Sequence, residues 1–193
     1  DPSGNRHELA LGYVSHFARF TSPAGVPRFV TGALGYGHAV LPAPEIAATR
    51  AFLIEVMGLG LSDLMIHRPL GPTGPAMRID FLHCANGRHH SLALFEGAVP
   101  SGCVHLMVEV DSLDAVGQAL DRVNADGFQL SSTLGRHTND KMVSFYVRAP
   151  GDWDIEFGTE GMRVDETYYT AEEITADSYW GHQWISDLPA AMR

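Results

Sequence analysis

The chain has 193 residues, 45% of them hydrophobic, and a formal net charge of −10. This length is enough for one large domain, or a pair of small similar modules, with a sizeable buried core. The sequence has no apolar run long enough to span a bilayer, which argues against a membrane protein, and no basic patch, which argues against nucleic acid as a partner.

Cysteine and histidine usage differ sharply. The two cysteines, Cys84 and Cys103, have hydrophobic neighbours and no CxxC spacing, so we interpret both as small core residues. With no signal peptide or targeting segment in the sequence, the simplest expectation is a reducing cytoplasm. Ten histidines, by contrast, are about twice the usual share for this length. That excess indicates a metal site or a proton-transfer site.

The first residues predict the end of another unit. The chain starts at Asp1 instead of a methionine, and DPSGNRHELALG resembles a turn that enters a strand. Residues 13–32 are irregular, with Pro23 and Pro27, as is typical of a connector. We therefore expect residues 1–32 to be the end of a preceding domain followed by a connector, and the chain to be part of a longer protein.

The following elements come twice in the same order: a strand, a helix and three strands. The first set is a strand at 37–41, a helix at 45–58, and strands near 61–68, 77–84 and 89–96. The second set is a strand at 104–110, a helix at 112–127 capped by Ser112, and strands at 128–133, 141–148 and 152–158. A repeat of this length predicts an α+β fold of two βαβββ modules, at 33–100 and 101–158, that share a core. The remaining residues, 159–193, are expected to pack over this domain as a C-terminal tail.

Alternation along the strands separates helix-packing positions from the others. His38, His105, Tyr146 and Glu156 all fall on faces that do not carry the regular apolar set. If the sheets curl so that these faces meet, two histidines and a carboxylate converge in one cavity. That ligand set is typical of non-haem Fe(II) with open coordination positions. Zinc is the rival metal, although three ligands without cysteine argue against a closed structural zinc site.

Taken singly, these residues have more ordinary interpretations. A histidine at the start of a strand is commonly a hydrogen-bonded structural residue, and Glu156 alone would be an unremarkable carboxylate. Alternation also leaves one choice open: His89 and His90 are adjacent and cannot both face the same cavity.

Five stretches together carry a family resemblance. They are LGYGHAVL, FLHCANGRHHSLAL, HLMVEVDSLDAVG, LGRHTNDKMVSFYVRAPGDWDIEFG and SYWGHQW, in order and at family-like spacing from Gly35 to Trp184. The sequence resembles the type I extradiol ring-cleaving dioxygenases, in particular the 2,3-dihydroxybiphenyl 1,2-dioxygenases of the vicinal oxygen chelate superfamily. The combination of RHHS with GRHTND is much more specific than either motif alone.

The resemblance implies Fe(II)-dependent cleavage of 2,3-dihydroxybiphenyl or a related bicyclic diol by dioxygen, in aromatic degradation. It implies paired βαβββ modules that form an incompletely closed barrel around the metal, a missing metal-free N-terminal pair of modules, and a homo-oligomer. The implied ligands of Fe(II) are His38, His105 and Glu156, and the implied acid–base histidine is His90. The implied groups around the substrate are His137, Asn139, Asp140 and Tyr146, with Val40 and Phe81 against the aromatic ring. Asn139 and Asp140 are expected to orient His137 and its loop.

Two alternatives remain. A glyoxalase-type isomerase that uses zinc or nickel would share the modules and a His/Glu ligand pattern, but would need neither His90 nor the HTND shell. A metal-free binding module of the bleomycin-resistance type would hold an aromatic ligand between modules, but would not need intact ligand positions.

Overall fold

The computed structural model describes residues 1–12, 18, 20–25, 28–68 and 73–185. Its main feature is one mixed sheet with the strand order β10-β6-β7-β8-β5-β1-β4-β3-β2-β9. The strands are β1 (Gly37–Pro42), β2 (Gly60–His67), β3 (Met77–His83), β4 (Leu92–Phe95), β5 (His105–Glu109), β6 (Leu130–His137), β7 (Val143–Ala149), β8 (Trp153–Thr159), β9 (Glu172–Ile174) and β10 (Ser178–Trp180). The helices are the 3-10 helix η1 (Gly32–Leu34), α1 (Ile46–Glu55) and α2 (Leu113–Ala125).

The two halves of the sheet are built alike. In each, the first strand pairs in parallel with the last, as β1 does with β4 and β5 with β8, and the remaining strands follow in antiparallel order. The halves join where β1 runs antiparallel to β5. Gly37 makes this junction possible, because a Cβ at that position would lie 1.9 Å from the Met107 carbonyl oxygen. The βαβββ order predicted from the sequence is therefore present twice.

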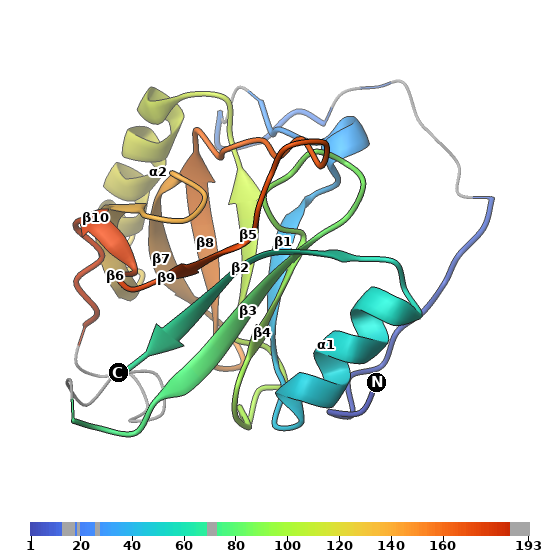
Figure 1. Cartoon of the computed structure of the whole chain (residues 1–193). Helices are drawn as coiled ribbons and strands as arrows, with labels where there is room; N and C mark the ends of the chain where they lie inside the picture. Colours follow the sequence, from blue (N-terminus) through green and yellow to red (C-terminus); the bar gives the residue numbers. More distant parts are fainter. Residues whose placement is uncertain (13–17, 19, 26–27, 69–72, 186–193) are drawn as a thin grey trace.

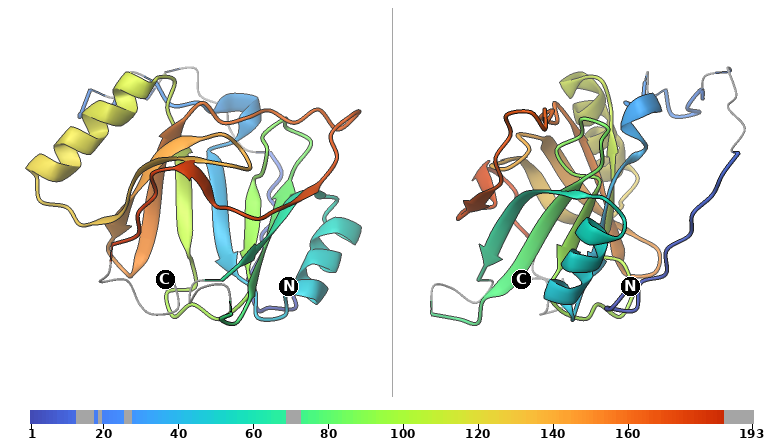
Figure 2. Two further views of the ribbon diagram at one scale, coloured as in Figure 1. Left: turned by 60° about the vertical axis from the view of Figure 1, so that its left-hand side comes forward. Right: turned by 45° about the vertical axis from the view of Figure 1, so that its right-hand side comes forward.

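Each helix covers the outer face of its own half (Figure 1; Figure 2). Leu53 of α1 packs with Leu82 and Leu94 in one core cluster, and Val116 of α2 packs with Phe145 in another. α2 starts where predicted, because the Ser112 side chain accepts a hydrogen bond from the Ala115 N–H (3.2 Å). α1 is shorter than the predicted helix at 45–58.

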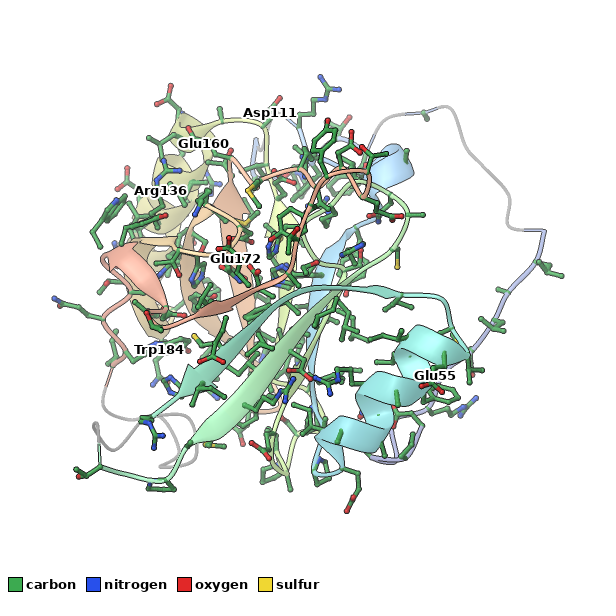
Figure 3. The ribbon with its side chains drawn as sticks, in the orientation of Figure 1. Glu55, Asp111, Arg136, Glu160, Glu172 and Trp184 are labelled. Carbon is green, nitrogen blue, oxygen red and sulfur yellow. The ribbon has the colours of Figure 1, made fainter. Side chains whose placement is uncertain are left out.

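The C-terminal segment ties the two ends of the sheet together. β9 pairs in parallel with β2, and β10 pairs antiparallel with β6, so one segment supplies both edge strands. The chain that leads into β9 crosses in front of β5 in Figure 1. In Figure 3, Glu172 and Trp184 of this segment lie well apart from Glu55 on α1. Neither of these two short strands was predicted from the sequence.

The sheet curves without closing, which agrees with an incompletely closed barrel. Residues 1–12 contain a turn and, as far as they are described, no strand. Parts of the expected connector (13–17, 19, 26–27) and of the tail (186–193) lie outside the described residues, and the division into domains stays a prediction. Among the described residues, no helix is both long and apolar enough to cross a membrane.

Candidate functional site

A cavity lies on the face of the sheet away from the helices. Its walls come from both halves of the sheet and from the C-terminal segment, which shows how strongly the sheet bends around it. All ten site residues proposed from the sequence line it: His38, Val40, Phe81, His90, His105, His137, Asn139, Asp140, Tyr146 and Glu156.

Three of these side chains meet at the bottom of the cavity, from the adjacent strands β1, β5 and β8. His38 Nε2 lies 3.1 Å from His105 Nε2, and Glu156 Oε2 lies 3.1 Å from His38 Nε2 and 3.3 Å from His105 Nε2. The side chains of His38 and Glu156 are buried, at 4% and 1% exposure.

The spacing of these three atoms fits one metal ion. Ligand atoms about 2.1 Å from an ion and at right angles to each other are about 3.0 Å apart. Two imidazole nitrogens and a carboxylate oxygen also match the donor set of a facial triad, which occupies one side of an ion and leaves the other side open. The geometry and the chemistry of the donors therefore both fit a divalent metal.

The second oxygen of Glu156 has its own partners. The Ser144 hydroxyl donates to Oε1 at 2.6 Å, and His137 Nε2 lies 3.4 Å from the same atom. Burial alone would raise the pKa of Glu156, but hydrogen bonds from His105, His137 and His38 outweigh it and hold the pKa well below its usual range. The carboxylate is thus ionised and fixed, with Oε2 left toward the two histidines.

His90 stands beside this cluster. Its ring lies 4.0 Å from that of His38 and 5.0 Å from that of Phe81, between centroids. Burial holds the pKa of His90 well below its usual value, so the ring is neutral at pH 7. The structure also resolves the choice that alternation left open: His90 lines the cavity, and His89 lies behind it with its Nδ1 3.0 Å from His90 Nδ1.

His137 and Tyr146 form a second polar group in the cavity. His137 Nε2 and the Tyr146 hydroxyl are hydrogen-bonded at 2.8 Å. Burial would lower the pKa of His137, but Asp177 and Glu156 raise it well above its usual value. Burial, followed by nearby carboxylates, raises the pKa of Tyr146. Tyr146 is therefore a neutral phenol at pH 7, next to a base of raised affinity for protons.

The roles expected of Asn139 and Asp140 differ from their contacts. Asp140 Oδ1 accepts a hydrogen bond from the Met142 N–H at 3.0 Å, which orders the loop, and its Oδ2 lies 4.0 Å from His90 Nδ1. His137 is held instead by Asp177, whose carboxylate lies 3.5 Å and whose carbonyl oxygen lies 3.3 Å from His137 Nδ1. Asn139 lines the cavity without a hydrogen bond to His137 among the described residues.

Sequence reasoning gave no role to His182, which packs behind His137. Its ring stacks on that of His137, with centroids 4.0 Å apart, and its Nδ1 lies 2.6 Å from the Ser178 hydroxyl. Gly181 allows this approach, since a Cβ there would lie 2.1 Å from the Leu134 carbonyl oxygen. The motif SYWGHQW was the available signal.

The other half of the cavity is apolar. Val40, Phe81, Met65, Phe95 and Val104 belong to one buried cluster, with Ile79 and Ile174 packed against it. All seven line the cavity. This surface suits an aromatic group that extends away from the three metal-ligand candidates.

Two further groups of side chains bring possible ligand atoms together, but in both groups some of these atoms already make hydrogen bonds to other residues. In the group of His137, Asp177 and His182, the imidazoles stack face to face, and both nitrogens of His182 are taken by Ser178 and Ser144. In the group of His38, His90 and Asp140, the Nδ1 of His90 is occupied by His89. His38, His105 and Glu156 are therefore the best metal site.

Comparison with known families and structures agrees with this architecture. The model of the Glyoxalase/Bleomycin resistance protein/Dioxygenase superfamily matches residues 35–157. An "Iron-dependent extradiol dioxygenase" of Rhodococcus jostii is 44% identical over 190 residues, which is 95% of this chain and 62% of that protein. A "Biphenyl-2,3-diol 1,2-dioxygenase" of Paraburkholderia xenovorans is 43% identical over 194 residues, covering 99% of this chain and 63% of that protein.

A solved structure is similar as well. The crystal structure of BphC, a halotolerant catechol dioxygenase, superposes with a TM-score of 0.74 at 38% identity, covering 85% of this chain and 53% of that one. The chain thus spans less than two thirds of the length of the curated relatives it matches.

Proposed function

This chain belongs to the Glyoxalase/Bleomycin resistance protein/Dioxygenase superfamily, and we propose that it is the iron-binding part of an extradiol dioxygenase. In this proposal the ligands of Fe(II) are His38, His105 and Glu156, and the substrate is a catecholic diol. The observation that carries it is the convergence of these three ligand atoms, 3.1–3.3 Å apart, at the bottom of a cavity that also holds His90 and Tyr146.

The charge of the site favours a diol that has lost one proton. Two neutral imidazoles and one carboxylate leave a ferrous ion with a single net positive charge. A catechol monoanion neutralises it, which lowers the cost of burying the ion and the substrate together. When bound, the ion supplies the open positions at which the diol and dioxygen are activated toward each other.

His137 and Tyr146 are placed to receive and hold the diol. The Tyr146 hydroxyl can donate to a substrate oxygen while His137, which its carboxylate partners keep protonated by raising its pKa, donates to the Tyr146 oxygen. Asp177 keeps the imidazole oriented through its contact with Nδ1. Ser144 fixes the carboxylate of Glu156 from behind, so that the ligand oxygen does not move as the proton leaves.

His90 is the acid–base group on the other side of the ligand cluster. Its neutral ring can accept a proton from the reacting oxygens and return it when the ring opens, which for positioned groups contributes about 10²–10⁴-fold to the rate. The apolar half of the cavity accommodates a second ring. We therefore propose 2,3-dihydroxybiphenyl or a related bicyclic diol as the preferred substrate, in agreement with the names of the relatives.

The test is oxygen consumption by the Fe(II)-loaded protein with a panel of catechols. We expect stoichiometric uptake of dioxygen and a yellow ring-opened product, with the highest kcat/KM for a bicyclic diol. Absence of oxygen uptake in protein shown to hold iron would reject the dioxygenase and favour an isomerase of the same superfamily. Tight binding of a catechol without turnover would favour a binding module.

A further inference from the structure

A buried chain of polar side chains runs behind His90. His89 bonds through Nδ1 to His90 Nδ1 (3.0 Å) and through Nε2 to Asp63 Oδ2 (3.0 Å). Exposure is 3% for Asp63, 1% for His89 and 3% for His90. Buried networks of this kind have fixed hydrogen directions, because a wrong direction leaves two lone pairs or two protons facing each other.

Asp63 determines the direction at one end of this chain. Its carboxylate faces three groups that can donate: the Glu172 N–H at 3.0 Å and the Tyr169 hydroxyl at 3.3 Å, both at Oδ1, and His89 Nε2 at Oδ2. A carboxylate that is surrounded by donors acts as an acceptor for all of them. When the His89 ring carries one proton, that proton therefore lies on Nε2, and Nδ1 carries a lone pair.

The direction then propagates to His90. With a lone pair on His89 Nδ1, the bond at 3.0 Å requires a proton on His90 Nδ1. The remaining nitrogen, Nε2, makes no hydrogen bond with any described residue and is free to act as the acceptor. The His90 Nδ1 proton points toward His89 whether or not His90 Nε2 carries a proton. The hydrogen bonds from Asp63 to His90 are therefore compatible with both the neutral and the protonated form of His90.

We propose that Asp63 and His89 are positioning residues that fix the tautomer of His90, so that Nε2 and not Nδ1 exchanges the proton during ring cleavage. This inference rests on the proposed function of the cavity. It gives the first histidine of the motif RHHS a task, whereas the resemblance assigned one only to the second.

The opposite arrangement has a physical cost. A proton on His89 Nδ1 would place the Nε2 lone pair 3.0 Å from a carboxylate oxygen, inside the protein and without solvent. Leaving buried acceptors unsatisfied in this way costs about 1–3 kcal/mol, more when one is charged. The Tyr169 hydroxyl, 3.1 Å from His89 Nε2, has a single proton and cannot satisfy both atoms.

The substitution Asp63→Asn inverts the direction without a change of shape, because an amide N–H can donate to His89 Nε2. We expect the His89 proton to move to Nδ1 and the His90 proton to move to Nε2. In the zinc-loaded, ¹⁵N-histidine-labelled protein, NMR spectra report which ring nitrogen is protonated. The His89 and His90 signals are assigned by their loss in His89→Gln and His90→Gln. In the Fe(II)-loaded protein, kcat should fall about 10²–10⁴-fold, while iron content and catechol affinity stay within twofold.

Two controls separate this effect from general damage. Asp80→Asn makes the same change at another buried carboxylate of the same half, one that pairs with Arg50 and Arg78, and should leave kcat and both tautomers unchanged. Tyr169→Phe removes one donor to Asp63 but keeps its charge, and should cost less than about tenfold.

Two results would overturn the inference: a wild-type His89 protonated on Nδ1, or Asp63→Asn with full kcat. The first is read from the wild type and therefore remains decisive if the variant does not fold. Failure of the proposed function looks different, since the iron-loaded wild type would then consume no oxygen whatever the tautomer.

Discussion

The two halves of the sheet share a topology and differ in what they place on the inner face. The half containing β5–β8 presents polar groups there, among them His105, Tyr146, Ser144 and Glu156. The half containing β1–β4 presents the apolar cluster around Val40, with His38 and His90 at its border with the other half.

The parallel strand pair of each half shows at which position the inner faces differ. In β5–β8, Met107 is opposite Glu156, whereas the corresponding parallel pair β1–β4 sets Val40 opposite Ala93. A carboxylate in one half thus has a small apolar counterpart in the other. The comparison shows that two copies of one unit can differ in the surface they give a shared cavity: one copy supplies most of its polar groups, and the other supplies most of its apolar wall.

The largest expected effect comes from removing the Glu156 carboxylate, which the other half of the sheet lacks. Glu156→Ala should abolish retention of iron, because two histidines alone hold a divalent ion weakly and Ser144 loses its partner. His105→Ala should do the same. Metal content after gel filtration measures both. The control Asp154→Asn, on the same strand two residues away, should keep its iron, since Asp154 bonds to Ser131 and Arg148 instead. Iron retained by Glu156→Ala would contradict the assignment.

The next effect concerns His90, the proposed acid–base group, which comes from the half that contains β1–β4. His90→Gln should keep iron and catechol but lose about 10²–10⁴-fold in kcat, since glutamine cannot exchange a proton. Stopped-flow absorbance of the bound catechol separates binding from turnover. His83→Gln makes the same change at a buried histidine of this half that does not line the cavity, and should remain active. A wild-type rate for His90→Gln would remove His90 from the reaction.

A smaller effect should sharpen the distinction between the halves. Ile79→Ala trims the apolar wall and should raise KM for a bicyclic diol by about 5–30-fold, corresponding to about 1–2 kcal/mol of lost burial, with little change for catechol itself. Steady-state kinetics on both substrates measure the ratio. Ile54→Ala, at an exposed position of α1, is the matched control. Equal effects on the two diols would show that the second ring does not lie against this wall.

The smallest effect is a pH-dependent contribution to stability from the polar half. Burial raises the pKa of Asp177, but His137 and Ser178 outweigh it and lower the value, while the pKa of His137 is raised. The Asp177 contribution is present above about pH 3.9 and is lost as pH falls through its lowered pKa. The His137 contribution is complete below about pH 6.5 and is lost as pH rises through its raised pKa.

Urea unfolding of the metal-free protein tests this window. Asp177→Asn should be less stable than the wild type by under about 1 kcal/mol, because the Asp177 side chain is 37% exposed and solvent screens the pair. The difference should be largest between about pH 4 and 6.5 and should shrink at higher pH. A difference that grows with pH would contradict the assigned directions.

Much of the inner face could be predicted because strands have a period of two. That period placed His38, His105, Tyr146 and Glu156 on the correct side, and it also placed Ser144 there, although no role was attached to it. The end of α1 was harder to predict. The sequence placed it at Gly58, a typical stop signal with a φ of 77°, but the helix already ends three residues earlier, at Glu55. Alternation could not distinguish His89 from His90, because both are buried and both precede β4, which begins at Leu92 instead of at the predicted residue 89.

The C-terminal contribution had no such periodic signal, and only the motif SYWGHQW pointed to it. β9 and β10 are three residues each, and they exist as strands because β2 and β6 offer open edges. Asp177 reaches the cavity and His182 reaches His137 through that pairing and through the close approach at Gly181, which are properties of the tertiary structure.

This arrangement bears on where the chain can be truncated. Residues 35–157, the span that the superfamily model matches, include the three proposed metal ligands, His38, His105 and Glu156. They omit Asp177, His182 and Trp184, which belong to a strap fastened to opposite rims of the sheet. In a shortened protein that ends at residue 157, the proposed metal site would lie in an open groove, and a bound substrate would be exposed to water on the side that the C-terminal segment covers in the full chain.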